Sequence, residues 1–173
     1  MPPEDEASPV GGRLQRFLPI WKFLQAPPTL LQILREGYVL PFKRKLPTTS
    51  RPLYLRAGNP QEVRTQVQKL AAKQAICKVS DPTSPGFYSR LFVVPKASGG
   101  FRPVIDLSSL SPYLRIPKFR METPASIKAA LQGSRWAGTV DLSDAYFHIP
   151  IHRSASPFLR FMVDGQVLSL IHI

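Results

Sequence analysis

The spacing of apolar residues predicts short helices in the first part of the chain. Between Arg13 and Tyr38 the apolar positions recur every three or four residues, as they do along one face of a helix. Pro27-Pro28 interrupts this pattern, because proline lacks the N–H group that a helix interior requires. Gly37 is a plausible stop. We therefore predict two amphipathic helices that are separated at the proline pair.

A third helix is predicted from about Pro60 to Lys78. Asn59 can cap its first turn, Pro60 suits the first helical position, and Glu62 completes a capping-box arrangement. The helix then carries a single apolar stripe, formed by Val63, Val67, Leu70 and Ala71, with Gln and Lys elsewhere. We interpret the stripe as core packing and Cys77 as a buried residue near the end of this helix.

Two strand-like runs, 89–95 and 101–107, are joined by a short connection that contains glycine. This pattern is typical of a β-hairpin. Pro103 lies inside the second run and cannot donate a hydrogen bond to a neighbouring strand. The second run is therefore predicted to be an edge strand or to contain a bulge.

The remaining apolar segments predict one more helix and two more strands. The helix spans about 124–132, with Thr123 as its cap and Gly133 as its stop. One strand, 136–140, ends immediately before Asp141. The last strand, 158–163, is followed by a turn at 164–165.

The net charge of the chain indicates which kind of molecule it binds. The chain has 173 residues with 23 Lys and Arg against 11 Asp and Glu, a net charge of +12. Such a body attracts polyanions, nucleic acid first, because each neutralised phosphate releases counterions. Solubility alone is the alternative explanation. The single cysteine excludes an internal disulfide and a cysteine-rich metal site.

Composition also sets expectations for the ends of the chain and for its location. Residues 1–12 combine acids, prolines and glycines without periodicity, so we predict a disordered tail. The basic, proline-rich stretch 41–58 is either a solvated linker or a strip that binds a nucleic-acid backbone. No apolar run approaches the ~20 residues of a membrane helix, and the acidic start is unlike a signal peptide. We expect an intracellular protein, in cytoplasm or nucleus, without a membrane partner.

Asp141 and Asp144 are the candidate residues for chemistry. At the end of a strand the Asp141 carboxylate would be exposed and rigidly held, where it can bind Mg²⁺. Asp144 could be a second ligand or could cap the following turn. A metal site built from His148 and His152 is not expected, because Pro150 breaks the helix that would align them.

The segment Asp141-Leu-Ser-Asp144-Ala-Tyr146-Phe147 resembles the first catalytic motif of retroviral and retrotransposon reverse transcriptases. Upstream, residues 91–107 are similar to the fingers hairpin of the same enzymes, and the two matches occur in the expected order. In detail the match is closest to DIRS-like retrotransposons, which combine a reverse transcriptase with a tyrosine recombinase. The segments that carry this finer resemblance are 86–96, 119–123 and 145–151. The resemblance covers about residues 12–167.

The resemblance implies an α+β fold. Residues 13–58 would form a helical, basic N-terminal extension, and residues 59–167 the fingers and the first part of the palm of a right-hand polymerase. Phe101, Trp136 and Phe147 are expected to belong to its core.

The resemblance also implies a role for each matching residue around the nucleotide. Asp141 would bind Mg²⁺ together with the backbone carbonyl of Leu142. Asp144 and Ala145 would direct backbone N–H groups at the incoming triphosphate, and Tyr146 would be a steric gate that excludes a ribose 2′-hydroxyl.

Two cations of the hairpin are expected at the β- and γ-phosphates. Arg102 matches the family position, and its planar guanidinium can bind two oxygens. Lys96 is the second candidate, for which an ordinary surface lysine is the alternative.

The partners implied are an RNA or DNA template-primer, deoxynucleotides, and the remaining palm, RNase H and recombinase regions of a parent polyprotein. Two-metal phosphoryl transfer in this family uses further aspartates from a later Tyr-x-Asp-Asp hairpin, which this sequence does not contain. We therefore expect this chain to be inactive alone. A non-catalytic nucleic-acid-binding remnant is the alternative function.

Residues 168–173, Leu-Ser-Leu-Ile-His-Ile, can be encoded by a DNA sequence that is known from another source. The sequence CTG-TCT-CTT-ATA-CAC-ATC encodes them and matches the transposase end that some sequencing libraries carry. We hypothesise a non-native C-terminal tail. Genomic DNA read across codon 168 tests this hypothesis, and a genomic sequence with those codons would contradict it.

Overall fold

The computed structural model describes residues 9–51, 59–97, 99–116, 118, 120–133, 136 and 138–172. Its α-helices are α1 (Arg13–Arg16), α2 (Leu18–Phe23), α3 (Pro28–Glu36), α4 (Pro60–Ala72) and α5 (Pro124–Ala130). The 3₁₀ helices are η1 (Ser111–Tyr113), η2 (Ala145–His148) and η3 (Arg153–Phe158). The strands are β1 (Ile76–Lys78), β2 (Arg90–Pro95), β3 (Phe101–Asp106), β4 (Arg160–Val163) and β5 (Gln166–Leu170). The chain is thus a mixed helix-and-sheet structure, as the sequence predicted.

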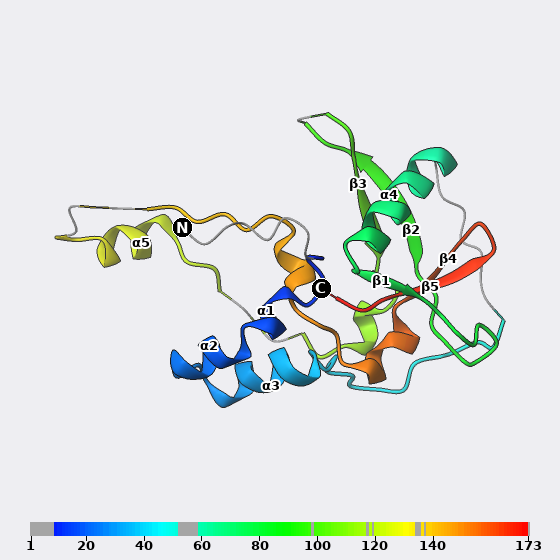
Figure 1. The fold of residues 1–173 in the computed structure, drawn as a ribbon, viewed down its shortest axis with the longest axis horizontal. Coiled ribbons are helices and arrows are strands. Elements are labelled where there is room, and N and C mark those ends of the chain that lie inside the picture. The colour runs from blue at the N-terminus through cyan, green and yellow to red at the C-terminus, as the bar shows by residue number, and fades with distance from the viewer. Residues whose placement is uncertain are drawn as a thin grey trace.

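Two antiparallel sheets organise the fold. The first has the order β1-β5-β4, with Ile76 opposite Leu170 and Arg160 opposite Ser169. The second is the hairpin of β2 and β3. Figure 1 shows α4 beside this hairpin, whereas α5 lies on an arm that projects away from both sheets. Helix α4 contacts both strands of the hairpin and also β1.

The hydrophobic core links these sheets to the helices around them. Its most deeply buried apolar side chains are Val63, Ala75, Leu110, Ala155, Leu159 and Phe161. Val63 and Leu70 of the predicted stripe on α4 are also buried, and Val67 packs partly buried against the same core. The interpretation of the stripe as core packing is confirmed at these three positions.

The N-terminal helices confirm the predicted break and add another. Helix α3 begins at Pro28 and is followed by Gly37, whose φ of 93° ends it in a conformation that glycine adopts readily. The segment before the proline pair forms two helices, α1 and α2, which meet at Phe17. No helix in the described ranges is long and apolar enough to cross a membrane.

Helix α4 is shorter than predicted. The Asn59 side chain caps it by accepting a hydrogen bond from the Glu62 N–H, but the helix ends at Ala72 and the chain turns at Gln74, where φ is 54°. Pairing with β5 places residues 76–78 in a strand, because backbone hydrogen bonds to a neighbouring strand outweigh a weak helix propensity. Cys77 therefore lies in β1 rather than in a helix, and partial burial raises the pKa of its thiol.

The predicted hairpin is confirmed. Strands β2 and β3 pair from Arg90 opposite Asp106 to Pro95 opposite Phe101, without a bulge. Within the described residues β3 pairs only with β2, so Pro103 stands in an edge strand. The Thr123 cap of α5 and the turn at Asp164 between β4 and β5 are also as predicted.

The strand predicted at 136–140 is absent from its described residues. Residues 136 and 138–141 form neither helix nor strand, and Trp136 is 93% exposed. The expectation of a core position for Trp136 was therefore wrong, whereas Phe147 packs partly buried against the core and Phe101 is partly buried. A strand needs a neighbour for its backbone N–H and C=O groups, and no described strand pairs with this segment.

Both ends of the chain pack against the fold where the structure describes them, and the hypothesis that residues 168–173 are non-native stays a prediction. Residues 168–170 belong to β5, the central strand of its sheet, and Ser169 is fully buried. At the other end, residues 1–8 lie outside the described residues, but the Gly11 N–H donates to the Lys73 carbonyl at 2.8 Å and Gly12 to the Phe147 carbonyl at 2.9 Å. Residues 9–12 are therefore packed against the fold.

Gly11 leaves no room for a side chain. A Cβ atom there would lie 2.5 Å from the Gln74 carbonyl oxygen, a backbone atom that cannot swing aside. We expect Gly11→Ala to lower the free energy of unfolding by about 1–3 kcal/mol, the usual cost of overpacking. Gly138→Ala is the matched control, because a Cβ at Gly138 meets nothing within 4 Å. Urea denaturation measures both, and equal midpoints for the two variants would contradict the close packing at Gly11.

Candidate functional site

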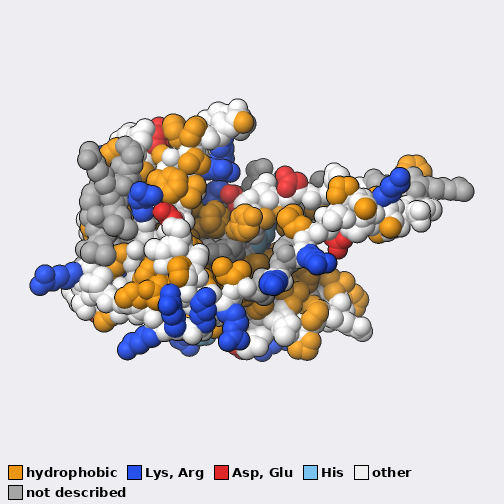
Figure 2. Space-filling view, turned by 180° about the vertical axis from the view of Figure 1, so that it is seen from behind, with side chains coloured by type: hydrophobic (Ala, Val, Ile, Leu, Met, Phe, Trp, Pro, Cys, Tyr) orange, Lys and Arg blue, Asp and Glu red, His pale blue; other side chains and the backbone are white. Residues whose placement is uncertain are grey.

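A pocket of ≈ 350 Å³ lies between α4, the β2–β3 hairpin and the segment that begins η2. Its lining residues are Gln66, Lys69, Leu70, Lys73, Lys96, Phe101, Arg102, Pro103, Asp144 and Phe147. In Figure 2 a hollow opens between the main body and the projecting arm, with Lys and Arg side chains at its upper rim. Segments that are far apart in the sequence thus meet at one cavity.

Lysine and arginine dominate the charge of this pocket. Lys96 and Arg102 lie on the hairpin, where the Lys96 N–H donates to the Gly100 carbonyl at 2.9 Å and closes the connection between the strands. Lys69 lies in α4 and Lys73, four residues on, is the residue that caps its C-terminal end. Asp144 is the single carboxylate among the lining residues. The pocket is therefore positively charged and suits an anion.

Asp144 links the start of η2 to α4. Its backbone is left-handed, with φ 55°, and its side chain makes no capping hydrogen bond to η2. The Lys73 ammonium lies 2.7 Å from its carboxylate, in a pair whose side chains are 38% and 30% exposed. Of the two alternatives for Asp144, capping is not observed, and the carboxylate instead fixes the η2 segment at the pocket.

The other predicted site residues are not among the residues that line the pocket. Asp141, Leu142 and Ala145 are exposed, and Tyr146 is 81% exposed. The described part of the chain contains no group of three or more His, Cys, Asp or Glu that could hold a metal ion. The structure thus joins Lys96, Arg102 and Asp144 in one pocket and leaves Asp141 outside its lining.

The two histidines near this segment make local hydrogen bonds. His148 is buried, and its Nε2 lies 3.1 Å from the Ser143 carbonyl oxygen. His152 Nδ1 lies 2.7 Å from the Ser154 hydroxyl. Each ring therefore stabilises its own turn, and His148 holds the loop that carries Asp144.

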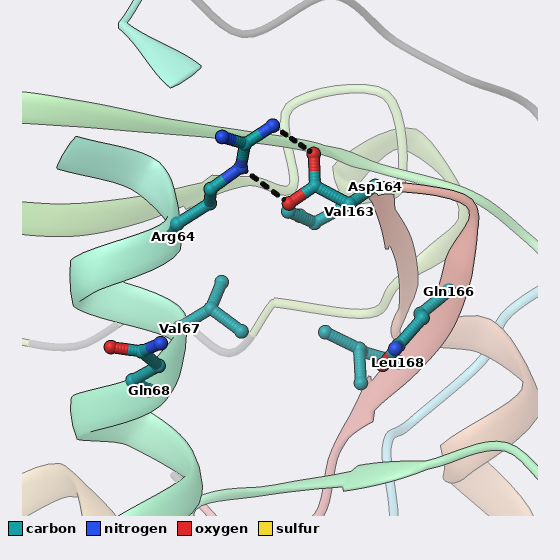
Figure 3. A pocket seen from close by; sticks show the side chains of 7 residues that line it. All are labelled: Arg64, Val67, Gln68, Val163, Asp164, Gln166 and Leu168. Atoms are coloured by element: carbon teal, nitrogen blue, oxygen red, sulfur yellow. Dashed lines mark hydrogen bonds and ion pairs between the residues drawn. The ribbon is translucent and has the colours of Figure 1, made fainter. Parts of the chain in front are cut away.

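A smaller pocket of ≈ 180 Å³ shows how α4 is fixed from its other side. Figure 3 shows Arg64 of α4 facing Asp164 at the β4–β5 turn. Arg64 Nε and one terminal nitrogen lie 2.7 and 3.1 Å from the two carboxylate oxygens. The hydrogen bond from Arg64 lowers the pKa of Asp164. The pair is half exposed and adds little stability, but its two-point geometry orients α4.

The sequence did not predict that residues of α4 line the pocket of ≈ 350 Å³, which we call the basic pocket. Its α4 wall consists of Gln66, Lys69, Leu70 and the following Lys73. Gln66, Lys69 and Lys73 were assigned to the polar side of a packing helix. Their spacing of three and four residues places them on one face, which is the available signal. This face lines a cavity only because the hairpin packs nearby. The spacing of residues along the helix does not specify where the hairpin lies.

Comparison with known proteins shows which known fold this chain is similar to. No protein-family model and no curated protein matches the chain. Among solved structures, the protease-reverse transcriptase of prototype foamy virus (CSH mutant, selenomethionine-labelled) matches with a TM-score of 0.54 and 17% identity, over 92% of this chain and 24% of that one. The fold is reverse-transcriptase-like.

Two further structures agree with this result. The foamy viral protease-reverse transcriptase in complex with double-stranded DNA gives a TM-score of 0.50 at 15% identity. The dRH form of that protein, also in complex with double-stranded DNA, gives a TM-score of 0.51 at 14% sequence identity. Each match covers 92% of this chain, which spans 38% and 31% of those chains respectively. The fold of this chain is therefore similar to part of the fold of those larger proteins.

Proposed function

We propose that this chain is the fingers and the first part of the palm of a retroelement RNA-directed DNA polymerase, and that the basic pocket binds the triphosphate of an incoming deoxynucleotide. One observation carries the proposal. Lys96 and Arg102 of the hairpin share a pocket with Asp144, and the sequence resemblance assigns all three to that nucleotide. The likeness to foamy virus enzymes supports the same fold.

Each residue around the pocket has a proposed role. Arg102 and Lys96 bind the β- and γ-phosphates, which a positively charged cavity attracts. The backbone N–H groups of Asp144 and Ala145 face the triphosphate. Tyr146, next in the chain and largely exposed, meets the sugar and excludes a ribose 2′-hydroxyl.

Magnesium is the proposed metal, and the residues present fit it only in part. Asp141 and the carbonyl of Leu142 are the hard oxygen ligands that this ion prefers, and Asp141 is exposed. Asp144 is held by Lys73 and is not free to join them. When bound, magnesium would stabilise the charge of the reacting phosphates. One carboxylate does not hold two ions, so the complete enzyme must supply further ligands.

The proposed partner is an RNA or DNA template-primer. The net charge of +12 favours a polyanion, and two of the foamy virus structures contain double-stranded DNA. The finer assignment to a DIRS-like element, with palm, RNase H and recombinase regions in the same polyprotein, rests on the sequence segments that resemble that group.

Arg102 provides a direct test of the nucleotide site. We expect Arg102→Ala to weaken binding of a deoxynucleoside triphosphate about ten-fold or more, since a hydrogen-bonded pair with a charged phosphate is lost. Arg153→Ala is the matched control, because Arg153 is exposed on η3 and does not line the pocket. Isothermal titration calorimetry measures both. Equal losses in the two variants would reduce the effect to net charge and contradict the proposed site.

Catalysis is tested separately from binding. We expect the purified chain to bind an RNA–DNA duplex in a salt-dependent manner and to give no primer extension with Mg²⁺, because Asp141 alone cannot hold two ions. A gel-based extension assay with labelled primer measures this. Extension by the purified chain that Asp141→Asn abolishes would contradict the expected inactivity.

A further inference from the structure

On the α4 side of the basic pocket, Gln66 has a side-chain amide that makes no hydrogen bond with any residue that the structure describes. Gln66 is 5% exposed and lines the cavity. Within the described ranges its amide forms no hydrogen bond, unlike the capping amide of Asn59 at the start of the same helix. Among the described residues, the fully enclosed side-chain N and O atoms without a partner are Ser89 Oγ and Arg160 Nε, so the Gln66 amide keeps access to solvent. Because Gln66 lines the cavity, its amide is available to donate a hydrogen bond to a ligand there.

Lys69 adds charge to the same wall. It lies three residues after Gln66 on α4 and also lines the pocket, so the two side chains share one face of the helix. Lys73, a turn further on, is paired with Asp144. Lys69 forms no ion pair with any residue that the structure describes. An amide and an ammonium group therefore stand side by side, both able to donate hydrogen bonds.

The opposite wall is also cationic. Lys96 and Arg102 of the hairpin face the same cavity. Four cations against one carboxylate leave the pocket with a charge of about +3, which exceeds what a single phosphate neutralises. The cavity of ≈ 350 Å³ falls within the size range of small-molecule sites. Its charge matches a chain of linked phosphates with cations on both sides.

We propose that Gln66 and Lys69 are ligand-binding residues of this pocket and contact an oligophosphate from the α4 side, opposite Lys96 and Arg102. The identity of the ligand as a nucleotide rests on the proposed function, but its oligophosphate chemistry does not. Gln66 donates its amide N–H to a phosphate oxygen, and Lys69 neutralises charge that the hairpin cations do not reach.

Inorganic triphosphate is the probe, because it carries the phosphates without base or sugar. We expect Lys69→Gln and Gln66→Leu each to weaken its binding about ten-fold, since each removes one hydrogen bond to a charged group. The matched controls are Lys78→Gln in β1 and Gln68→Leu on α4, because both residues are exposed and lie outside this pocket. Calorimetry on the full chain measures affinity, and thermal melting checks the fold.

The outcomes separate this inference from the proposed function. Wild-type affinity in both α4 variants, or equal losses in the controls, overturns the inference. If Gln66→Leu does not fold, Lys69→Gln against Lys78→Gln decides. Weakened triphosphate binding in the α4 variants supports the inference even when the wild-type chain binds neither deoxynucleotide nor RNA–DNA duplex, a result that would refute the proposed function alone. If Arg102→Ala weakens triphosphate binding and the α4 variants do not, the inference is overturned and the proposed function stands.

Discussion

The pairing of β5 with both β1 and β4 is the constraint on which the rest of the structure depends. Through Ile76 opposite Leu170 it fixes the chain just after α4, and through the β4–β5 turn it presents Asp164 to Arg64 of the same helix. Helix α4 is therefore held at both ends. Its remaining free face points to the hairpin, and the basic pocket forms in that space.

The pocket concentrates positive charge that the fold alone does not require. Like charges that share a cavity repel one another, and solvent reduces that cost while Lys69, Lys96 and Arg102 are exposed. The carboxylate of Asp144 offsets one charge through Lys73 and at the same time fixes the η2 loop. The excess of positive charge in this pocket is what the proposed binding of an anionic ligand requires.

Much of the fold was predictable wherever a pattern acts locally. The caps at Asn59 and Thr123 and the hairpin turn need only neighbouring residues, and all are present. The prediction was wrong where a distant strand decides the outcome. Residues 76–78 leave their helix because β5 offers hydrogen bonds. The segment before Asp141 stays irregular because no described strand pairs with it.

For the site, the sequence by itself determined which charged and hydrogen-bonding groups are present. It named Lys96, Arg102 and Asp144 as candidates, and the net charge indicated an anionic partner. Only the tertiary structure decided that these residues line one pocket together with Gln66 and Lys69. It also decided that Lys73 forms an ion pair with Asp144. The physical reason is that residue type sets charge and hydrogen-bonding capacity locally, whereas the partner of each group depends on long-range packing between α4, the hairpin and η2.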